Sequence, residues 1–279
     1  MKVFPFNIPK PQNIGLIYQE DKALYFYDKL HQHEEIQLCT IIKGSGTLII
    51  GDAISDYKAG DVLVIGSNLP HVFKSNASTN ETSFMISLFF TEGSFGHDFF
   101  NLDDFKELKS FFKKSLFGCK LLSNQQKIQQ HFLALQQASN LKRFIGFFEI
   151  LKQINSSKTI PLADFLSPKK YTDNQGKRMR NIMDYTIHNF NTNIDLQKIS
   201  SKANMTPNAF CRYFKQRTNK TYFSFLNELR VDNACKLLVG NKDLSISEIA
   251  YESGFQNLSN FNRKFKEVKK MTPSAYRKT

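Results

Sequence analysis

The sequence predicts an α+β protein of two domains, in which a strand-rich barrel with following helices precedes an all-helical domain. Three observations predict this class. Residues 1–90 hold short runs of strand-forming residues separated by glycine turns. From residue 98 the apolar residues recur every three or four positions, which is a helical period. In the last third of the chain, one helical pattern occurs twice.

Composition indicates an ordinary globular protein. The chain has 279 residues, 41% of them hydrophobic and 23% charged, which suits two domains. No apolar run reaches the ~18 residues of a membrane span, and the first residues lack a secretory segment. The four cysteines form no paired motif, so we expect reduced thiols, no zinc knuckle and a cytoplasmic protein.

The positive charge is concentrated in the last third of the chain. The net charge is +13 overall. Residues 178–279 carry 18 Lys+Arg against 8 Asp+Glu, a net charge of +10, whereas residues 1–177 carry a net charge of +3. A basic domain beside a nearly neutral one indicates a polyanionic partner for the basic part.

The strands of the first domain are expected where β-rich runs alternate with turns. The predicted strands are residues 23–30, 35–42, 46–52, 61–66, 71–75 and 83–90. Gly44 and Gly46 mark one turn, and Gly51 with Asp52 marks another. Short strands at this spacing are typical of a sandwich or a barrel.

Helices are expected at residues 98–115, 124–138 and 140–154. The last two carry more apolar surface than packing on a small barrel needs. The clearest cases are Phe132, Phe144, Phe147, Phe148 and Leu151. The excess predicts an exposed patch and a homodimer through this segment. The alternative is that these residues only seal the barrel.

The domain boundary is expected in a polar segment that contains proline. Residues 155–177 have no sustained hydrophobic period, so we interpret them as a linker. Residues 1–154 then form the sensing and dimerisation domain, and residues 178–279 form the DNA-binding domain.

The repeat lies in residues 195–221 and 245–272. Each copy reads as a short helix, a tight turn and a second helix. Asn204 and Gly254 stand at the two turns, where a left-handed backbone is needed. Thr206 and Asn257 are expected to cap the second helices. The matched positions include two phenylalanines, one arginine and one lysine per copy: Phe210 and Phe261, Arg212 and Arg263, Phe214 and Phe265, Lys215 and Lys266.

This is the helix-turn-helix pattern, and it predicts DNA binding. The phenylalanines bury one face of each second helix. The opposite faces present Asn208, Cys211 and Arg212 in one copy and Ser259, Asn260 and Arg263 in the other. A guanidinium can bond guanine and an amide can bond adenine, while Lys215 and Lys266 suit phosphates. A helical bundle with merely solvated polar faces is the alternative, but two matched copies in a basic domain favour DNA.

Between the copies, residues 221–238 form one helix in regular register. Eighteen residues at 1.5 Å give a rod of ~27 Å. Such a rod could hold the two second helices about one duplex turn apart, ~34 Å, on one face of DNA.

Residues 178–279 resemble the AraC/XylS family of bacterial transcription regulators. The resemblance rests on "ISEIAYESGFQNLSNFNRKFK" and on the closing "MTPSAYR". It implies seven helices and two helix-turn-helix units that read successive major grooves. It also implies base or near-base roles for seven residues: Asn208, Cys211, Arg212, Leu258, Ser259, Asn260 and Arg263. The chain departs from the family at Asn219 and Lys270, where glycine is usual; lysine tolerates a left-handed cap poorly.

Residues 10–90 resemble the cupin barrel through "HQHEEIQLCTIIKGSG" and "GDVLVIGSNLPHVF". The resemblance maps the family's metal ligands onto His31, His33, Gln37 and His71, with Gln37 in place of the usual glutamate. Alternate residues of a strand share a face, so three imidazoles with an amide are a plausible set for a divalent first-row metal. Glu35 has the same parity and could compensate for Gln37.

The alternative for this set is an effector pocket without metal. In that reading His31, His33, Gln37 and His71 bind a sugar or another small polar ligand. Tyr25, Tyr27 and Phe89 are the expected aromatic liners.

The sequence therefore predicts a transcription regulator and not an enzyme. It would bind specific double-stranded DNA under the control of a small-molecule effector in the cupin barrel, by a shift of population between two arrangements. The main rival is a metal-dependent cupin enzyme, a dioxygenase or isomerase, with an accessory DNA-binding domain. A constitutive architectural DNA binder is the third hypothesis.

Overall fold

The computed structural model describes residues 5–11, 14–76, 82–167, 171–241 and 243–278. The chain divides into two compact units, Met1–Gly176 and Lys177–Thr279. Each unit is described by itself. Among the described residues, no helix has the length and apolar character needed to cross a membrane.

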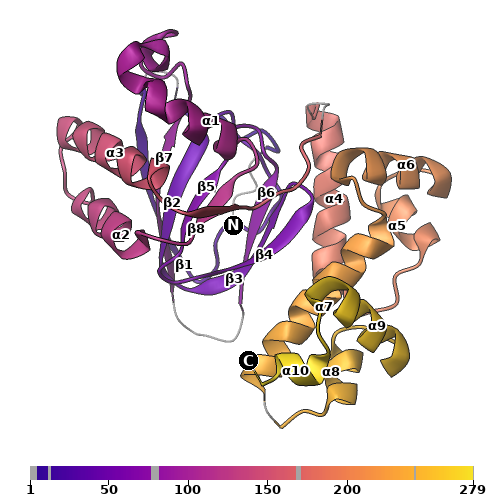
Figure 1. The fold of residues 1–279 in the computed structure, drawn as a ribbon. Coiled ribbons are helices and arrows are strands. Elements are labelled where there is room, and N and C mark those ends of the chain that lie inside the picture. Colours follow the sequence, from indigo (N-terminus) through magenta and orange to yellow (C-terminus); the bar gives the residue numbers. More distant parts are fainter. Residues whose placement is uncertain (1–4, 12–13, 77–81, 168–170, 242, 279) are drawn as a thin grey trace. The chain divides into compact units, whose positions relative to one another are not determined.

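The first unit contains two antiparallel sheets (Figure 1). The larger sheet has the strand order β1-β7-β2-β5-β8-β9 and the smaller has the order β4-β3-β6. Between them lies a buried cluster with side chains from both sheets, including Cys39, Ile50, Tyr57, Phe73 and Met85. The strands are β1 (Ile17–Ala23), β2 (Ile36–Lys43), β3 (Ser45–Ile50), β4 (Ala53–Lys58), β5 (Val62–Ile65), β6 (His71–Ser75), β7 (Ser83–Phe90), β8 (Cys119–Leu121) and β9 (Thr159–Pro161).

Five of the six predicted strands are confirmed, as β2, β3, β5, β6 and β7. The strand predicted at residues 23–30 is wrong. β1 lies earlier, pairs with β7 from Ile17 to Ala23, and is followed by irregular chain. β4, β8 and β9 were not predicted; β4 pairs with β3 in the smaller sheet.

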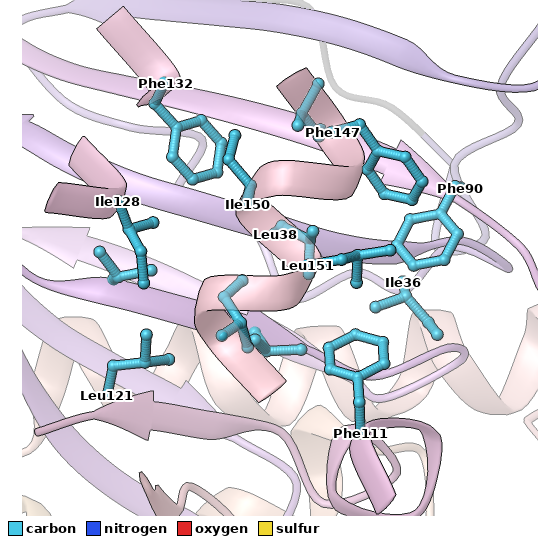
Figure 2. Close-up of a cluster of buried hydrophobic side chains, with 14 of the residues drawn as sticks. Ile36, Leu38, Phe90, Phe111, Leu121, Ile128, Phe132, Phe147, Ile150 and Leu151 are labelled. Atoms are coloured by element: carbon cyan, nitrogen blue, oxygen red, sulfur yellow. The ribbon is translucent and has the colours of Figure 1, made fainter. Parts of the chain in front are cut away.

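The helices after the barrel cover one face of the larger sheet (Figure 2). They are two 3-10 helices, η1 (Phe99–Asn101) and η2 (Asp103–Leu108), and the α-helices α1 (Lys109–Ser115), α2 (Gln125–Ala134) and α3 (Asn140–Asn155). Phe132 and Phe147 pack against Leu38 and Phe90 in one buried cluster. Alternation along β2 explains the two cores, since Leu38 faces these helices and Cys39 faces the other sheet.

The expectation that the aromatic residues of α2 and α3 form an exposed patch is wrong for these side chains. Phe132 and Phe147 are 0% exposed and Leu151 is 1% exposed, while Phe144 and Phe148 are half-buried. They fill the space between sheet and helices, as the alternative held. The exposed apolar residues on these helices are instead Leu133, Leu141 and Ile145.

The predicted linker begins too early. Asn155 is the last residue of α3, residues 159–161 form β9, which pairs with β8, and Leu162 and Ala163 are buried. The carboxylate of Asp52 accepts hydrogen bonds from the backbone N–H groups of Asp164 and Phe165 at 3.0 and 3.1 Å. Residues 155–165 therefore belong to the first unit, because β-pairing and this carboxylate hold them there.

Seven helices make up the described part of the second unit, the number that the family resemblance implies. They are α4 (Asp173–Asn189), which begins just before the unit boundary, α5 (Leu196–Lys202), α6 (Pro207–Thr218), α7 (Tyr222–Gly240), α8 (Ile246–Glu252), α9 (Leu258–Lys269) and α10 (Pro273–Tyr276). α5 with α6, and α8 with α9, are the two predicted helix-turn-helix units.

The local chemistry of both turns agrees with the prediction. Asn204 and Gly254 have φ values of 51° and 88°, in the left-handed region. Thr206 caps α6 by accepting from the N–H of Ala209, and Asn257 caps α9 by accepting from the N–H of Asn260. Gly254 is also required for space, because an added Cβ would lie 2.7 Å from the carbonyl oxygen of Phe190.

Candidate DNA-binding face and histidine pocket

The second helix of each helix-turn-helix unit is fixed by two phenylalanines. Phe210 and Phe214 on α6, and Phe261 and Phe265 on α9, are all 0% exposed. Residues on the other faces point away from the core. All nine predicted DNA-contact residues lie there, with Asn260 half-buried and the others exposed: Asn208, Cys211, Arg212, Lys215, Leu258, Ser259, Asn260, Arg263 and Lys266.

The outer face of α9 also carries one carboxylate among its cations. Glu267 accepts a hydrogen bond from Lys264 at 2.8 Å and lies 3.8 Å from the guanidinium of Arg263. The bond from Lys264 lowers the pKa of Glu267, so this group stays ionised. The face is therefore mixed in charge beside Arg263.

The first unit holds a partly open cavity of about 320 Å³. His31, His33, Gln37 and His71 line it, as the resemblance predicted. The backbones of His31 and His71 are joined by two hydrogen bonds, of 3.1 and 2.9 Å. One nitrogen from each of the three rings lies within 4.8 Å of the others. The three imidazoles therefore form a single cluster.

The outer nitrogen of each ring is held by a backbone carbonyl. Nδ1 of His31, His33 and His71 lies 2.8, 2.8 and 2.9 Å from the carbonyl oxygens of Lys29, Glu35 and Leu69. A carbonyl can only accept, so Nδ1 carries the proton and Nε2 of a neutral ring presents a lone pair. Nε2 of His33 is buried and has no hydrogen-bond partner among the described residues.

Burial also keeps two of these rings uncharged. It lowers the pKa of His33 to about 3, with the charge of His71 as the second cause. It lowers the pKa of His71 to about 4. Both rings are neutral near pH 7, the state in which imidazole binds metal.

Gln37 is oriented by a residue that the sequence did not single out. Its amide nitrogen donates to the hydroxyl of Ser87 at 2.9 Å, and the side chain of Gln37 lies beside the His33 ring. Three imidazole lone pairs and an amide oxygen fit a divalent first-row metal. Backbone bonds to Nδ1 are the outer contacts that ligating histidines commonly make. The residues present therefore fit such an ion.

Glu35 does not complete this set, contrary to the expectation from strand parity. Its carboxylate lies 4.0 Å from Nδ1 of His33, which is the outer nitrogen of that ring. It lines a different cavity. Glu35 precedes β2, so strand alternation does not fix its direction.

Three further polar residues line the cavity and were missed. Nζ of Lys10 donates to Oε1 of Gln19 at 3.0 Å, and Nε2 of Gln19 donates to the Asp21 carboxylate at 2.7 and 3.0 Å. Lys10 also lies 3.6 Å from the ring centre of Phe89. Burial lowers the pKa of Lys10 and raises the pKa of Asp21. Lysine and aspartate are thus linked through Gln19 in the lining of the cavity.

Two of the three aromatic residues that were predicted to line the cavity do so, and one does not. Tyr27 and Phe89 line the cavity. Tyr25 is 49% exposed and lies outside it, because residues 24–30 follow β1 as irregular chain and do not alternate.

Comparison with known proteins agrees with both halves of this description. Residues 199–279 match the family model of a helix-turn-helix domain, and residues 26–89 match that of a cupin domain. The chain joins a cupin domain to a helix-turn-helix domain. It is a transcription regulator by this combination of domains.

Relatives extend over most of this cupin regulator. An uncharacterized HTH-type transcriptional regulator, YdeC, of Bacillus subtilis (strain 168) is 25% identical over 90% of this chain and 87% of its own. An uncharacterized HTH-type regulator from the cgkA 5' region of Pseudoalteromonas carrageenovora is 24% identical over 53% of this chain and 98% of its own.

Solved structures are also similar to this chain. The DNA-binding domain of AdpA, in complex with a target DNA, is 25% identical and covers 35% of this chain and 86% of its own, with a TM-score of 0.33. ToxT from Vibrio cholerae O395 is 14% identical and covers 94% of this chain and 97% of its own, with a TM-score of 0.37.

Proposed function

We propose that this chain is a cytoplasmic, sequence-specific regulator of transcription whose DNA binding is controlled by a small molecule in the cupin cavity. One observation carries the proposal. Two outward helix faces with matched arginines occur in the same chain as a cavity lined by converging polar groups. The first suits a duplex, and the second suits a small ligand.

On the DNA side, the two arginines are the base readers. Arg212 and Arg263 occupy equivalent exposed positions on α6 and α9, so each can present its guanidinium to a guanine edge. Lys215 and Lys266 stand near the next turn and neutralise phosphates. Leu258 and Cys211 are poor hydrogen-bonding readers, and suit contact with a thymine methyl group or a sugar.

On the sensor side, an effector in the cavity would contact the histidine cluster and Gln37. His31, His33, His71 and Gln37 would hold a divalent metal, whose positive charge would attract an effector with an oxygen donor. Without metal, the Gln37 amide would turn over and donate to Nε2 of His33, and the same groups would bind a sugar or another polar ligand directly. In both forms, a ligand acts only by its different affinity for two arrangements of the protein.

The assembly that fits this function is a homodimer through α2 and α3. Leu133, Leu141 and Ile145 are 39%, 70% and 58% exposed on these two helices. Exposed apolar side chains that cluster on a surface commonly mark a partner surface. A dimer would place four recognition helices on a repeated site and raise affinity through effective concentration.

Selection from a random duplex library tests the proposal. The purified full chain is expected to enrich one sequence pattern and to bind it in preference to its scrambled form. The rival hypothesis, a metal-dependent dioxygenase or isomerase, predicts instead that the chain converts a small-molecule substrate whether or not DNA is present. An architectural binder would enrich no pattern, and that result would contradict our proposal.

A further inference from the structure

We propose that the effector is a small organic monoanion, a carboxylate, which binds beside a divalent metal held by His31, His33, His71 and Gln37. This inference rests on the effector pocket of the proposed function. It depends on the charges that surround the cluster in this chain, and above all on an amide at position 37.

The ligand set itself leaves the charge of the ion unbalanced. An imidazole that binds a metal through Nε2 is neutral, and the amide of Gln37 is neutral as well. A glutamate at this position would remove one positive charge from the site. With glutamine, a divalent ion keeps its full charge of two among its protein ligands.

The remaining walls of the cavity do not supply the missing charge. Lys10 and Asp21 are linked through Gln19 and offset each other. The Glu35 carboxylate lies behind His33, 4.0 Å from its Nδ1, and lines a different cavity. A divalent ion among these ligands therefore leaves the site positive. Because His31, His33, Gln37 and His71 are buried, an unpaired charge beside them is costly, so a negatively charged ligand is favoured.

Ser87 makes Gln37 suitable as an oxygen ligand. Its hydroxyl accepts the amide N–H at 2.9 Å, and both side chains are buried. The amide oxygen is then the end left to meet the ion. Ser87 stands on β7 and Gln37 on β2, which are paired strands, so the sheet fixes this orientation.

The remaining lining residues indicate that the uncharged part of the ligand is apolar. Phe26, Phe73, Met85 and Phe89 supply apolar walls to a cavity of about 320 Å³. An inorganic anion would leave these walls without contacts. A carboxylate on a short apolar chain would place its charge at the histidines and its body against the aromatic rings.

The test uses the full chain loaded with Co²⁺, because visible absorption of this ion reports ligand exchange. The probes are propionate and propionamide, which have nearly the same shape and differ in charge. Propionate is expected to shift the spectrum at a concentration about tenfold lower than propionamide. Equal responses to both probes would overturn the inference.

Gln37→Glu gives two opposite expectations in one variant. Chelator competition should show tighter metal binding by about tenfold, because the ion gains an anionic ligand. Propionate binding should weaken by about the same factor, because the added carboxylate makes the site less positive. A fold defect would weaken both. Gln137→Glu, on an exposed residue, is the matched control and should change neither.

Elemental analysis separates this inference from the function it rests on. Absence of stoichiometric metal after incubation with zinc, nickel, manganese, iron or cobalt would overturn the inference. It would leave DNA selection and metal-free effector binding standing. If Gln37→Glu fails to fold, the comparison of propionate with propionamide on the unmodified chain still decides.

Discussion

Arg263 donates a hydrogen bond from Nη2 to the side-chain oxygen of Asn260, one turn back on α9, at 2.8 Å. Glu267, one turn on, lies 3.8 Å from the same guanidinium. In α6 the positions equivalent to Asn260 and Glu267 are Ala209 and Gln216. The arginine of the second helix-turn-helix unit is thus oriented by its own helix, and the arginine of the first unit lacks both of these partners.

This difference predicts unequal base discrimination by the two arginines. A single interaction of this spacing on a helix contributes ~0.2–0.5 kcal/mol, so Asn260→Ala should reduce discrimination at the base that Arg263 reads by about twofold. Ala209→Asn supplies Arg212 with the equivalent partner, so it should sharpen discrimination at the base that Arg212 reads. Binding to duplexes with single base changes measures both, and a uniform change on all duplexes would contradict the prediction.

The end of α9 predicts a stabilising substitution. Lys270 has a φ of 60° and Asn219, at the end of α6, has a φ of 53°. Both helices therefore end on a left-handed residue, as expected from the positions where the family has glycine. Lys270→Gly should raise the free energy of unfolding by about 1 kcal/mol, because lysine is strained there.

Lys269→Gly is the control for that substitution. Lys269 is the last residue of α9 and has no left-handed backbone, so glycine there should destabilise by roughly 0.5–1 kcal/mol. Urea unfolding of the full chain measures both changes. Equal destabilisation by the two variants would show that the cap carries no strain.

The buried histidines predict acid sensitivity of the metal-free protein. The pKa values of His33 and His71 are lowered in the folded state to about 3 and about 4. The unfolded chain, with an ordinary pKa near ~6.5, binds protons first as pH falls. The stability that depends on these two neutral rings is therefore fully present above about pH 6.5. It is lost as pH falls toward the pKa values of the rings in the folded protein.

Each of the two groups can contribute a slope of up to about 1.4 kcal/mol per pH unit. The midpoints of urea unfolding of chelator-treated protein, taken between about pH 4.5 and pH 7.5, measure this slope. His33→Leu should flatten the dependence. His97→Gln should leave it unchanged, because the side chain of His97 is 96% exposed. An identical slope in all three proteins would contradict the burial of these rings.

The apolar surface of α2 and α3 predicts a dimer that charge can break. Leu141→Glu and Ile145→Glu should convert the full chain to a monomer in sedimentation, because each places a carboxylate in the proposed interface. Leu24→Glu is the control, since Leu24 is 57% exposed but lies outside these helices. A chain without substitutions that sediments as a monomer at tens of micromolar would exclude this interface.

The parts of the fold that the sequence predicts are those with strong local signals. The helix-turn-helix units were predictable because the turn residues recur 50 positions apart and the caps and buried phenylalanines recur 51 positions apart. β1 was missed because its sequence, IYQEDKA, is polar and its residues are mostly half-buried at the edge of the sheet. β8 and β9 have three residues each, and their pairing depends on tertiary contacts that no local pattern records.

The candidate site was predictable only where a motif marked it. His31, His33, Gln37 and His71 stand at motif positions, and they do converge. Lys10, Gln19 and Asp21 reach the same cavity from the N-terminal segment and from β1, which were not assigned to the barrel. Hydrophobic periodicity placed Phe132 on a helix stripe but could not show that the sheet covers that stripe.

The most direct test of the central claim is the ratio of affinities for the selected duplex and its scrambled form. Arg212→Ala and Arg263→Ala should each cost ~1–3 kcal/mol on the selected duplex and little on the scrambled one, so that the ratio falls. Lys215→Ala and Lys266→Ala should weaken both duplexes equally and flatten the salt dependence. Equal losses on both duplexes for the arginine variants would contradict the claim that these two helices read DNA sequence.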